Sequence, residues 1–378
     1  MTASLPTATT SAPAPSARAL LDRSREVVEP AYRRAVGLLP SPVDRVAGYH
    51  AGWWDASGRP SDASGKAIRP ALVLAAASAA SAASAASAAS AASAASAASA
   101  AGFGWEGETC AAIRAAGVAV EMVHDFSLLH DDVMDGDTTR RHRPAAWTVF
   151  GTGQAIVAGD LLLTTALDLV PGPDPVPAAF AREARSVLSG AVARLCAGQA
   201  HDLRFEQCTT VTLDECLAMA DGKTAALLEA SCRLGALAAG ADGRAADALA
   251  TFGRQLGIAF QLVDDLLGIW GDPSVTGKPA GSDLASRKKS LPVVAALNAR
   301  TKASAELAAL YATSRPLTAD EITRAAALVD RAGGRGWARN EADRRLAAAF
   351  TALEAASIPA GRQSGLRALA ALLATRDH

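Results

Sequence analysis

The chain has 378 residues, half of them apolar, and carries 37 basic and 38 acidic side chains for a formal net charge of -1. This composition excludes a globally disordered protein, and the charge balance excludes a polycation that binds nucleic acid through its overall field. Recognition of anions must therefore come from local groups of lysine and arginine, and we expect a small substrate and no nucleic-acid partner.

Residues 1–17 consist mainly of Thr, Ser, Ala and Pro, without the basic start and apolar stretch of a secretory signal. We predict that they form a disordered tail, which either has no role or docks on a protein partner. The remainder, 18–378, is predicted to form one domain.

A low-complexity block follows at residues 78–101, where Ser-Ala-Ala is repeated eight times. Alanine favours helix, but a step of three residues turns each serine back by about 60°, so that no apolar stripe forms. The pattern predicts a weakly packed helical insertion, either inert or an interaction arm. Serine at every third position makes a membrane-spanning helix improbable.

Elsewhere the chain reads as helix almost throughout, which predicts an all-α protein. Apolar residues recur at spacings of three and four in the segments 111–131, 181–204, 213–238 and 245–270. Clusters of Gly and Pro predict breaks at 57–60, 171–177, 240–243, 271–281 and 332–336. Three later segments are predicted to be scaffold helices: 306–311, 319–332 and 340–355.

Two pairs of aspartates interrupt these apolar helices. Carboxylates in apolar surroundings are costly unless a cation balances their charge. On a helix Asp131 and Asp135 share one face, whereas Asp132 points aside. The second pair is Asp264 and Asp265. Carboxylates stacked in this way suit Mg²⁺, which takes its remaining ligands from water and phosphate. A solvated acidic patch is the alternative.

Basic residues with phosphate-binding spacing accompany the acids. Arg140 and Arg141 follow the first pair, and Lys66 and Arg69 lie upstream. Guanidinium groups bind phosphate oxygens through two hydrogen bonds, so an arginine pair beside a metal site suits a diphosphate. Two separate basic groups imply two substrates, although each alone could be a solvent-exposed face.

The motifs of residues 62–298, in this order, resemble those of the trans-isoprenyl diphosphate synthases, the polyprenyl synthetase family. The matching stretches are Gly-Lys-x-x-Arg-Pro at 65–70, His124 with 127–132, Arg140-Arg141, 158–160, 198–202, 222–224, 260–265, 277–284 and 289–292. The resemblance implies an isoprenoid-synthase helical bundle around a central cavity. It also implies a cytoplasmic homodimer that joins isopentenyl diphosphate head-to-tail to an allylic diphosphate.

The resemblance also implies a role for individual residues. The diphosphate of isopentenyl diphosphate would be held by Lys66, Arg69, His124 and Arg141. Three Mg²⁺ ions on the allylic diphosphate would be held by Asp131, Asp135 and Asp264. That grip would be completed by Arg140, Lys223, Lys278 and Lys289. The allylic carbon would be faced by the oxygens of Thr224 and Gln261.

One feature departs from the family pattern, and another would set the length of the product. Gly268 stands where many members carry a third aspartate, as in actinobacterial members, so Asp264 would act there with Asp265 or Asp283. Phe126 and Ser127, five and four positions before Asp131, would lie at the floor of the cavity, where a Phe would stop an elongating chain and a Ser would not. By resemblance the product is geranylgeranyl diphosphate (C20), with farnesyl diphosphate as the alternative.

Other functions fit the residues less well. A class I terpene cyclase would need a second metal motif that the stretch after Gly268 lacks, and it would not use Lys66 or Arg69. A non-catalytic partner subunit would not need intact acids and arginines. The five cysteines form no metal-ligand spacing and indicate free thiols in a reducing compartment.

Overall fold

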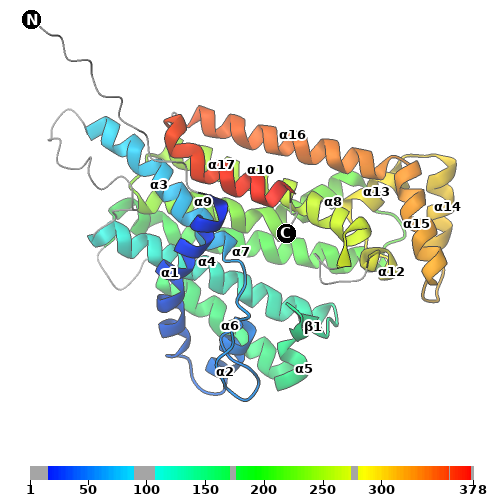
Figure 1. Cartoon of the computed structure of the whole chain (residues 1–378), viewed down its shortest axis with the longest axis horizontal. Helices are drawn as coiled ribbons and strands as arrows, with labels where there is room; N and C mark the ends of the chain where they lie inside the picture. Colours follow the sequence, from blue (N-terminus) through cyan, green and yellow to red (C-terminus); the bar gives the residue numbers. More distant parts are fainter. Residues whose placement is uncertain (1–15, 89–106, 171–175, 274–279, 357, 376–378) are drawn as a thin grey trace, which may run out of the picture.

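The computed structural model describes residues 16–88, 107–170, 176–273, 280–356 and 358–375. These residues form long helices packed side by side, which confirms the predicted all-α fold (Figure 1). The helices are α1 (Ala17–Val36), α2 (Val43–His50), α3 (Ile68–Ala88), α4 (Gly107–Met134), α5 (Ala146–Phe150), α6 (Thr152–Leu169), α7 (Ala178–Gln207), α8 (Leu213–Ala220), the π-helix η2 (Asp221–Ala225), α9 (Ala226–Ala238), α10 (Gly243–Trp270), α12 (Ser282–Ala285), α13 (Leu291–Asn298), α14 (Lys302–Tyr311), α15 (Ala319–Arg331), α16 (Gly334–Ala355) and α17 (Ala360–Thr375).

The helices that carry the predicted site residues pack against one another. α10 contacts α9, α16 and η2, η2 also contacts α7, and α4 contacts α6, α3 and α9. In Figure 1, α16 and α17 run along one long side of the molecule, whereas α2, α5 and α6 lie on the opposite side. The predicted scaffold helices α14 and α15 form one end of the molecule.

The first Ser-Ala-Ala repeat is packed more tightly than predicted. α3 continues through Ala88, and Ala79 and Ala80 are fully buried. Alanine is small enough to let neighbouring helices approach closely, and a Cβ on Gly235 of α9 would lie 2.2 Å from the Val73 carbonyl oxygen of α3. The expectation of weak packing is therefore wrong at the start of the block, and residues 89–101 lie outside the described residues.

The N-terminal boundary also differs slightly from the prediction. The Ser16 hydroxyl accepts a hydrogen bond from the Ala19 amide at 3.2 Å, and α1 begins at Ala17. A serine in this position satisfies one of the unpaired amides of the first helical turn. Residues 1–15 of the predicted tail lie outside the described residues.

A short hairpin after α4 was not predicted. Strands β1 (Thr139–Arg140) and β2 (Arg143–Pro144) pair antiparallel, and Arg141 and His142 form the turn with φ of 51° and 60°. Two residues with positive φ match the twist of paired strands, but glycine or asparagine normally occupies such positions. The hairpin fixes the direction in which the side chains of Arg140 and Arg141 extend from the backbone.

The cysteines agree with the expectation of free thiols. No disulfide joins Cys110, Cys196, Cys208, Cys216 or Cys232, all of which lie in the described part of the chain.

Candidate active site

An acidic site forms where α4, α7 and η2 meet. Asp131 lies in the last turn of α4 and Asp135 directly follows the helix, one turn on, where the Asp135 amide donates to the Asp131 carbonyl at 2.8 Å. Lys223 Nζ lies 2.8 Å from Asp202 Oδ2 and 3.8 Å from Asp131 Oδ2. The predicted residues Asp131, Asp135 and Lys223 are therefore brought together, and Asp202 joins them although the sequence had suggested no role for it.

The carboxylates of this site repel one another. Burial raises the pKa of Asp131 to about 6, and Asp135 and Asp202 add to the rise, whereas Lys223 opposes it. Asp135 is more exposed, but desolvation and the charge of Asp202 raise its pKa as well. A group of carboxylates whose negative charge is not fully balanced favours the binding of a cation.

Lys223 and Thr224 are presented by the π-helix η2 rather than by a regular α-helix. Two glycines allow α7 to approach it: a Cβ on Gly198 would lie 2.3 Å from the Lys223 nitrogen, and one on Gly222 would lie 2.7 Å from the Arg194 carbonyl oxygen. Single π-turns within α-helices are common at functional sites because they redirect side chains. Here the wide turn directs Lys223 toward Asp202 and Thr224 toward α10.

A chain of hydrogen bonds fixes the orientation of Gln261. The Thr224 hydroxyl donates to Gln261 Oε1, and Gln261 Nε2 donates to Asp265 Oδ1 at 2.8 Å. Asp265 Oδ2 in turn accepts from the Leu291 amide at 2.8 Å, at the first turn of α13. Thr224 and Gln261 therefore lie side by side with fixed oxygens, and their orientation toward the allylic carbon stays a prediction.

Asp265 belongs to the interior rather than to the metal-binding face. Its side chain is buried, and burial raises its pKa to about 7 while Lys288 and the two hydrogen bonds oppose the rise. Both carboxylate oxygens accept hydrogen bonds from inside the protein. The alternative that Asp265 joins Asp264 as a ligand is therefore not supported, and Asp264 is the partly exposed member of the pair.

The space above Gly268 is filled by Asp283. A Cβ on Gly268 would lie 2.4 Å from Asp283 Oδ2, so a side chain at position 268 and Asp283 would exclude each other. Asp283 thus brings a carboxylate to the place where many family members carry the third aspartate of the motif. The absence of an acid at Gly268 does not leave this side of the site uncharged.

Lys288 is the cation that faces these acids. Burial lowers its pKa, but the carboxylates of Asp265 and Asp283, followed by those of Asp202 and Asp264, raise it more, so the net shift is upward. The ammonium group therefore stays charged at neutral pH. Lys288 therefore lies close enough to the acids of α10, α12 and α7 for their charges to stabilise its ammonium group.

Lys289, which the sequence analysis had placed in this role, lies elsewhere. Its Nζ donates to the Phe205 carbonyl oxygen at 2.5 Å, near the end of α7, and burial lowers its pKa. The positive φ of Arg287, 53°, turns the chain before the two lysines. The surroundings of the two lysines therefore favour Lys288 over Lys289 for a contact with the allylic diphosphate, and the turn at Arg287 separates two adjacent residues that the sequence alone does not distinguish.

The arginines of the hairpin are each held by a buried carboxylate of α4. Arg140 Nε donates to Asp132 Oδ1 at 2.8 Å, and its Nη2 contacts the same oxygen. Arg141 Nη2 lies 3.7 Å from Asp125 Oδ1. Asp132 is buried, and its role is to anchor Arg140.

A second basic site surrounds His124. Burial lowers the pKa of His124, and the nearby charges of Arg69 and Arg141 lower it further, so the imidazole is neutral. Arg69 and Arg141 also act together on Glu121 of the same helix. Three of the four residues assigned to isopentenyl diphosphate are thus close neighbours. Lys66 is exposed, in the loop just before α3, and Lys278 of the other group lies outside the described residues.

The two chain-length residues differ in their surroundings. Phe126 is buried in the core and packs edge-on against His130, with 4.9 Å between ring centroids. His130 Nε2 lies 3.0 Å from the Ile156 carbonyl of α6. The Ser127 hydroxyl donates to the His124 carbonyl of its own helix at 2.7 Å. Phe126 therefore packs in the core beside His130, and His130 in turn contacts α6.

The side chains fit Mg²⁺ better than a metal that needs a closed cage. Among the described residues, no three metal-binding side chains converge on one point. Mg²⁺ is usually bound through one or two carboxylates, with water and substrate phosphate as its other ligands. The oxygen donors Asp131 and Asp135, with their raised pKa values, match that requirement.

An all-α fold that combines an acidic site with a separate guanidinium site is suited to an enzyme that handles two anionic substrates. The Polyprenyl synthetase family model matches residues 56–329. The chain therefore belongs to the polyprenyl synthetase family and is a prenyltransferase, as the motifs indicated.

Similar proteins agree with this assignment. A geranylgeranyl diphosphate synthase of Mycobacterium tuberculosis is 45% identical over 97% of this chain and 96% of its own length. A (2E,6E)-farnesyl diphosphate synthase of Mycobacterium bovis is 41% identical over 95% and 93%. The crystal structure of a polyprenyl synthetase from Streptomyces coelicolor A3(2) is 42% identical, with a TM-score of 0.81 over 94% of this chain and 98% of that one. The chain is thus a short-chain trans-isoprenyl diphosphate synthase.

Among the described residues, no helix is both long enough and apolar enough to cross a membrane.

Proposed function

We propose that the protein joins isopentenyl diphosphate head-to-tail to an allylic diphosphate and releases geranylgeranyl diphosphate. The observation that carries this proposal is the pairing of two different anion sites: carboxylates around Lys223 and Lys288, and guanidinium groups around His124. The first suits a metal-bound diphosphate and the second a diphosphate without metal.

In this proposal Asp131, Asp135 and Asp264 would hold Mg²⁺, which would supply positive charge for the diphosphate that leaves as the allylic C–O bond breaks. Lys223 and Lys288 contact the same diphosphate, together with Arg140 and the predicted Lys278. These cations stabilise the leaving group more in the transition state than in the ground state, because its negative charge grows as the bond breaks.

The hydrocarbon becomes a carbocation at this point. We assign its stabilisation to the oxygens of Thr224 and Gln261, which are held in place before reaction by Asp265. Fixed dipoles of this kind stabilise a developing charge without having to reorganise. The double bond of isopentenyl diphosphate, held by Lys66, Arg69, His124 and Arg141, then attacks, and loss of a proton to the departing diphosphate completes the product.

The test is incubation of the protein with Mg²⁺, isopentenyl diphosphate and C5, C10 or C15 allylic diphosphates, followed by chromatography of the dephosphorylated alcohols. We expect a C20 alcohol from each primer. Elongation that stops at C15 would support the farnesyl alternative, and absence of elongation with any primer would support a non-catalytic subunit.

Phe126 is expected to set the product length. Phe126→Ala should shift the main product beyond C20 by at least one five-carbon unit, because it opens space in the core beside His130. Product chromatography measures the shift. Phe180→Ala, which removes an equally buried ring from α7, serves as the control and should lower stability without changing the product. Unchanged length in Phe126→Ala would remove Phe126 from the floor.

Mg²⁺ binding should weaken as the pH falls through about 6. The pKa of Asp131 in the folded protein lies above its ordinary value, at about 6, so the carboxylate is neutral below that pH and charged above it. Without metal, the folded state binds more protons than the unfolded state between about pH 4 and pH 6, so stability should fall as the pH rises through this range. The apparent affinity for Mg²⁺ should instead rise roughly fourfold from pH 5.5 to 7.5, because the charged fraction of Asp131 rises by that factor. The stabilisation by Mg²⁺ should grow with it.

Melting temperatures measured with and without Mg²⁺ at both pH values, in the absence of substrate, test this expectation. Asp131→Asn is the control, and its response to Mg²⁺ should be weak and independent of pH. A wild-type response that is equal at both pH values would show that Asp131 does not titrate against the metal.

The oligomeric state stays a prediction. Exposed large apolar side chains gather around α5, α6 and the end of α4: Met134, Val149, Ile156 and Val157. Such residues support the proposed homodimer, because a second copy of the chain could cover them.

A further inference from the structure

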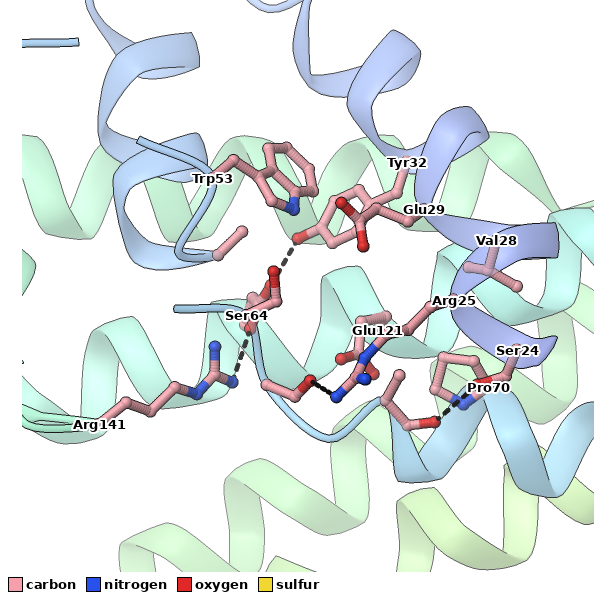
Figure 2. Close-up of a pocket in the computed structure, with 14 residues that line it drawn as sticks. Ser24, Arg25, Val28, Glu29, Tyr32, Trp53, Ser64, Pro70, Glu121 and Arg141 are labelled. Carbon is pink, nitrogen blue, oxygen red and sulfur yellow. Dashed lines mark hydrogen bonds and ion pairs between the residues drawn. The ribbon is translucent and has the colours of Figure 1, made fainter. Parts of the chain in front are cut away.

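Asp125 is a buried carboxylate behind the guanidinium site, and the mechanism above does not use it. Its side chain is only 3% exposed, and Tyr32 of α1 donates a hydrogen bond to its Oδ2 at 2.7 Å. Arg141 Nη2 lies 3.7 Å from Oδ1, and Figure 2 shows Tyr32 and Arg141 reaching the pocket from different sides. Burying a carboxylate is costly unless a cation balances it, so Arg141 and Asp125 depend on each other.

The guanidinium of Arg141 lies between the buried carboxylate of Asp125 and the proposed site for isopentenyl diphosphate. Its side chain is 24% exposed, and a guanidinium has more donors than one carboxylate oxygen can use. The group is also confined by the backbone, because a Cβ on Gly65 would lie 2.7 Å from Nη2. Arg141 itself has a φ of 51°, which is uncommon for a residue other than glycine and often marks a functional constraint.

The contact between the two side chains leaves room for adjustment. Asp125 Oδ1 has no hydrogen-bond partner, and His50 Nε2, 3.6 Å away, has none either. A small cavity of about 40 Å³ adjoins this place, and it is lined by Tyr32, Asp125 and Arg141 among others. Tyr32 therefore fixes one carboxylate oxygen, and the other can accept a hydrogen bond from Arg141 after a shift of less than one bond length.

We propose that Asp125, held by Tyr32, is the positioning residue of Arg141 and orients its guanidinium toward the diphosphate of isopentenyl diphosphate. This inference rests on the proposed function, because it takes Arg141 as a ligand of that substrate. It assigns α1 a part in substrate affinity, although the contact with Asp125 is made inside the protein.

Asp125→Asn tests the proposal, since the amide keeps the shape and removes the charge. The Kd and KM for isopentenyl diphosphate should rise about tenfold, whereas the KM for the allylic diphosphate and kcat at saturation should change by less than about twofold. Tyr32→Phe should act in the same direction, by about threefold. Calorimetry gives the Kd, and initial rates give both KM values.

A double-mutant cycle separates positioning from a general effect on folding. In an Arg141→Lys background, Asp125→Asn should add less than about twofold, because the group that it orients has been changed. Glu341→Gln is the matched control: it removes the charge of a buried carboxylate that pairs with Arg344 and Arg345 on α16, and should leave both KM values unchanged.

Three results would overturn the proposal: an unchanged Kd in Asp125→Asn, equal weakening of both substrates, or a full effect of Asp125→Asn in the Arg141→Lys background. A wild-type protein that neither binds isopentenyl diphosphate nor elongates any primer would instead overturn the proposed function, and this inference with it. Calorimetry on the wild type distinguishes the two failures.

Discussion

Asp131→Asn is expected to lower kcat by about 10³-fold, equivalent to ~4 kcal/mol of transition-state stabilisation. Asp131 is the partly buried acid of α4 that lies 3.8 Å from Lys223 and shares a face with Asp135. Asparagine keeps the volume but provides no negative charge for Mg²⁺, so the leaving diphosphate loses a large part of its counter-charge. Single-turnover rates at saturating Mg²⁺ measure the chemical step directly.

The same variant should leave the second substrate almost unaffected. Isopentenyl diphosphate is assigned to the guanidinium site around His124, so its Kd in Asp131→Asn should stay within about twofold of the wild-type value. Asp168→Asn, which removes an exposed carboxylate from α6, is the control for loss of charge and should keep full activity. An Asp131→Asn enzyme with more than a tenth of the wild-type rate would contradict the metal assignment.

The helices and the acidic face could be predicted because both depend on local periodicity. Apolar residues at spacings of three and four require a helix with one buried face, and on such a helix Asp131 and Asp135 must lie together. The contacts of η2 with α7 and α10 could not be predicted from local periodicity. The π-turn at Lys223 depends on close contact with Gly198, a residue of another helix, and no local pattern marks that contact.

The anchors of the arginines were also beyond prediction. The turn at Arg141 and His142 has no glycine or asparagine to signal it, and its partners Asp132 and Asp125 are identified only when the hairpin lies against α4. For Gly268, the sequence left Asp265 and Asp283 open as the acid that acts with Asp264, and only the fold shows that Asp283 lies over the glycine from a separate segment. Pattern identifies which residue types are present, and packing decides which of them face the substrate.

The adjacent lysines give the sharpest test of that distinction. Lys288→Met is expected to lower kcat by about 10²-fold and to raise the KM for the allylic diphosphate, since it removes the cation that faces Asp265 and Asp283. Lys289→Met should keep kcat within about threefold, because it loses only a hydrogen bond to the Phe205 carbonyl, at a cost of ~1 kcal/mol in stability. Initial rates and melting temperatures of the two variants measure the contrast.

Loss of Lys288 also leaves buried carboxylates unpaired, which costs about 3–5 kcal/mol and could prevent folding. Asp283→Asn combined with Lys288→Met removes one charge of each sign, so it should recover most of the melting temperature without recovering kcat. Recovery of kcat in that double variant would mean that Lys288 serves only to neutralise Asp283. A larger loss of kcat in Lys289→Met than in Lys288→Met would contradict this assignment. It would mean that Lys289, and not Lys288, contacts the diphosphate.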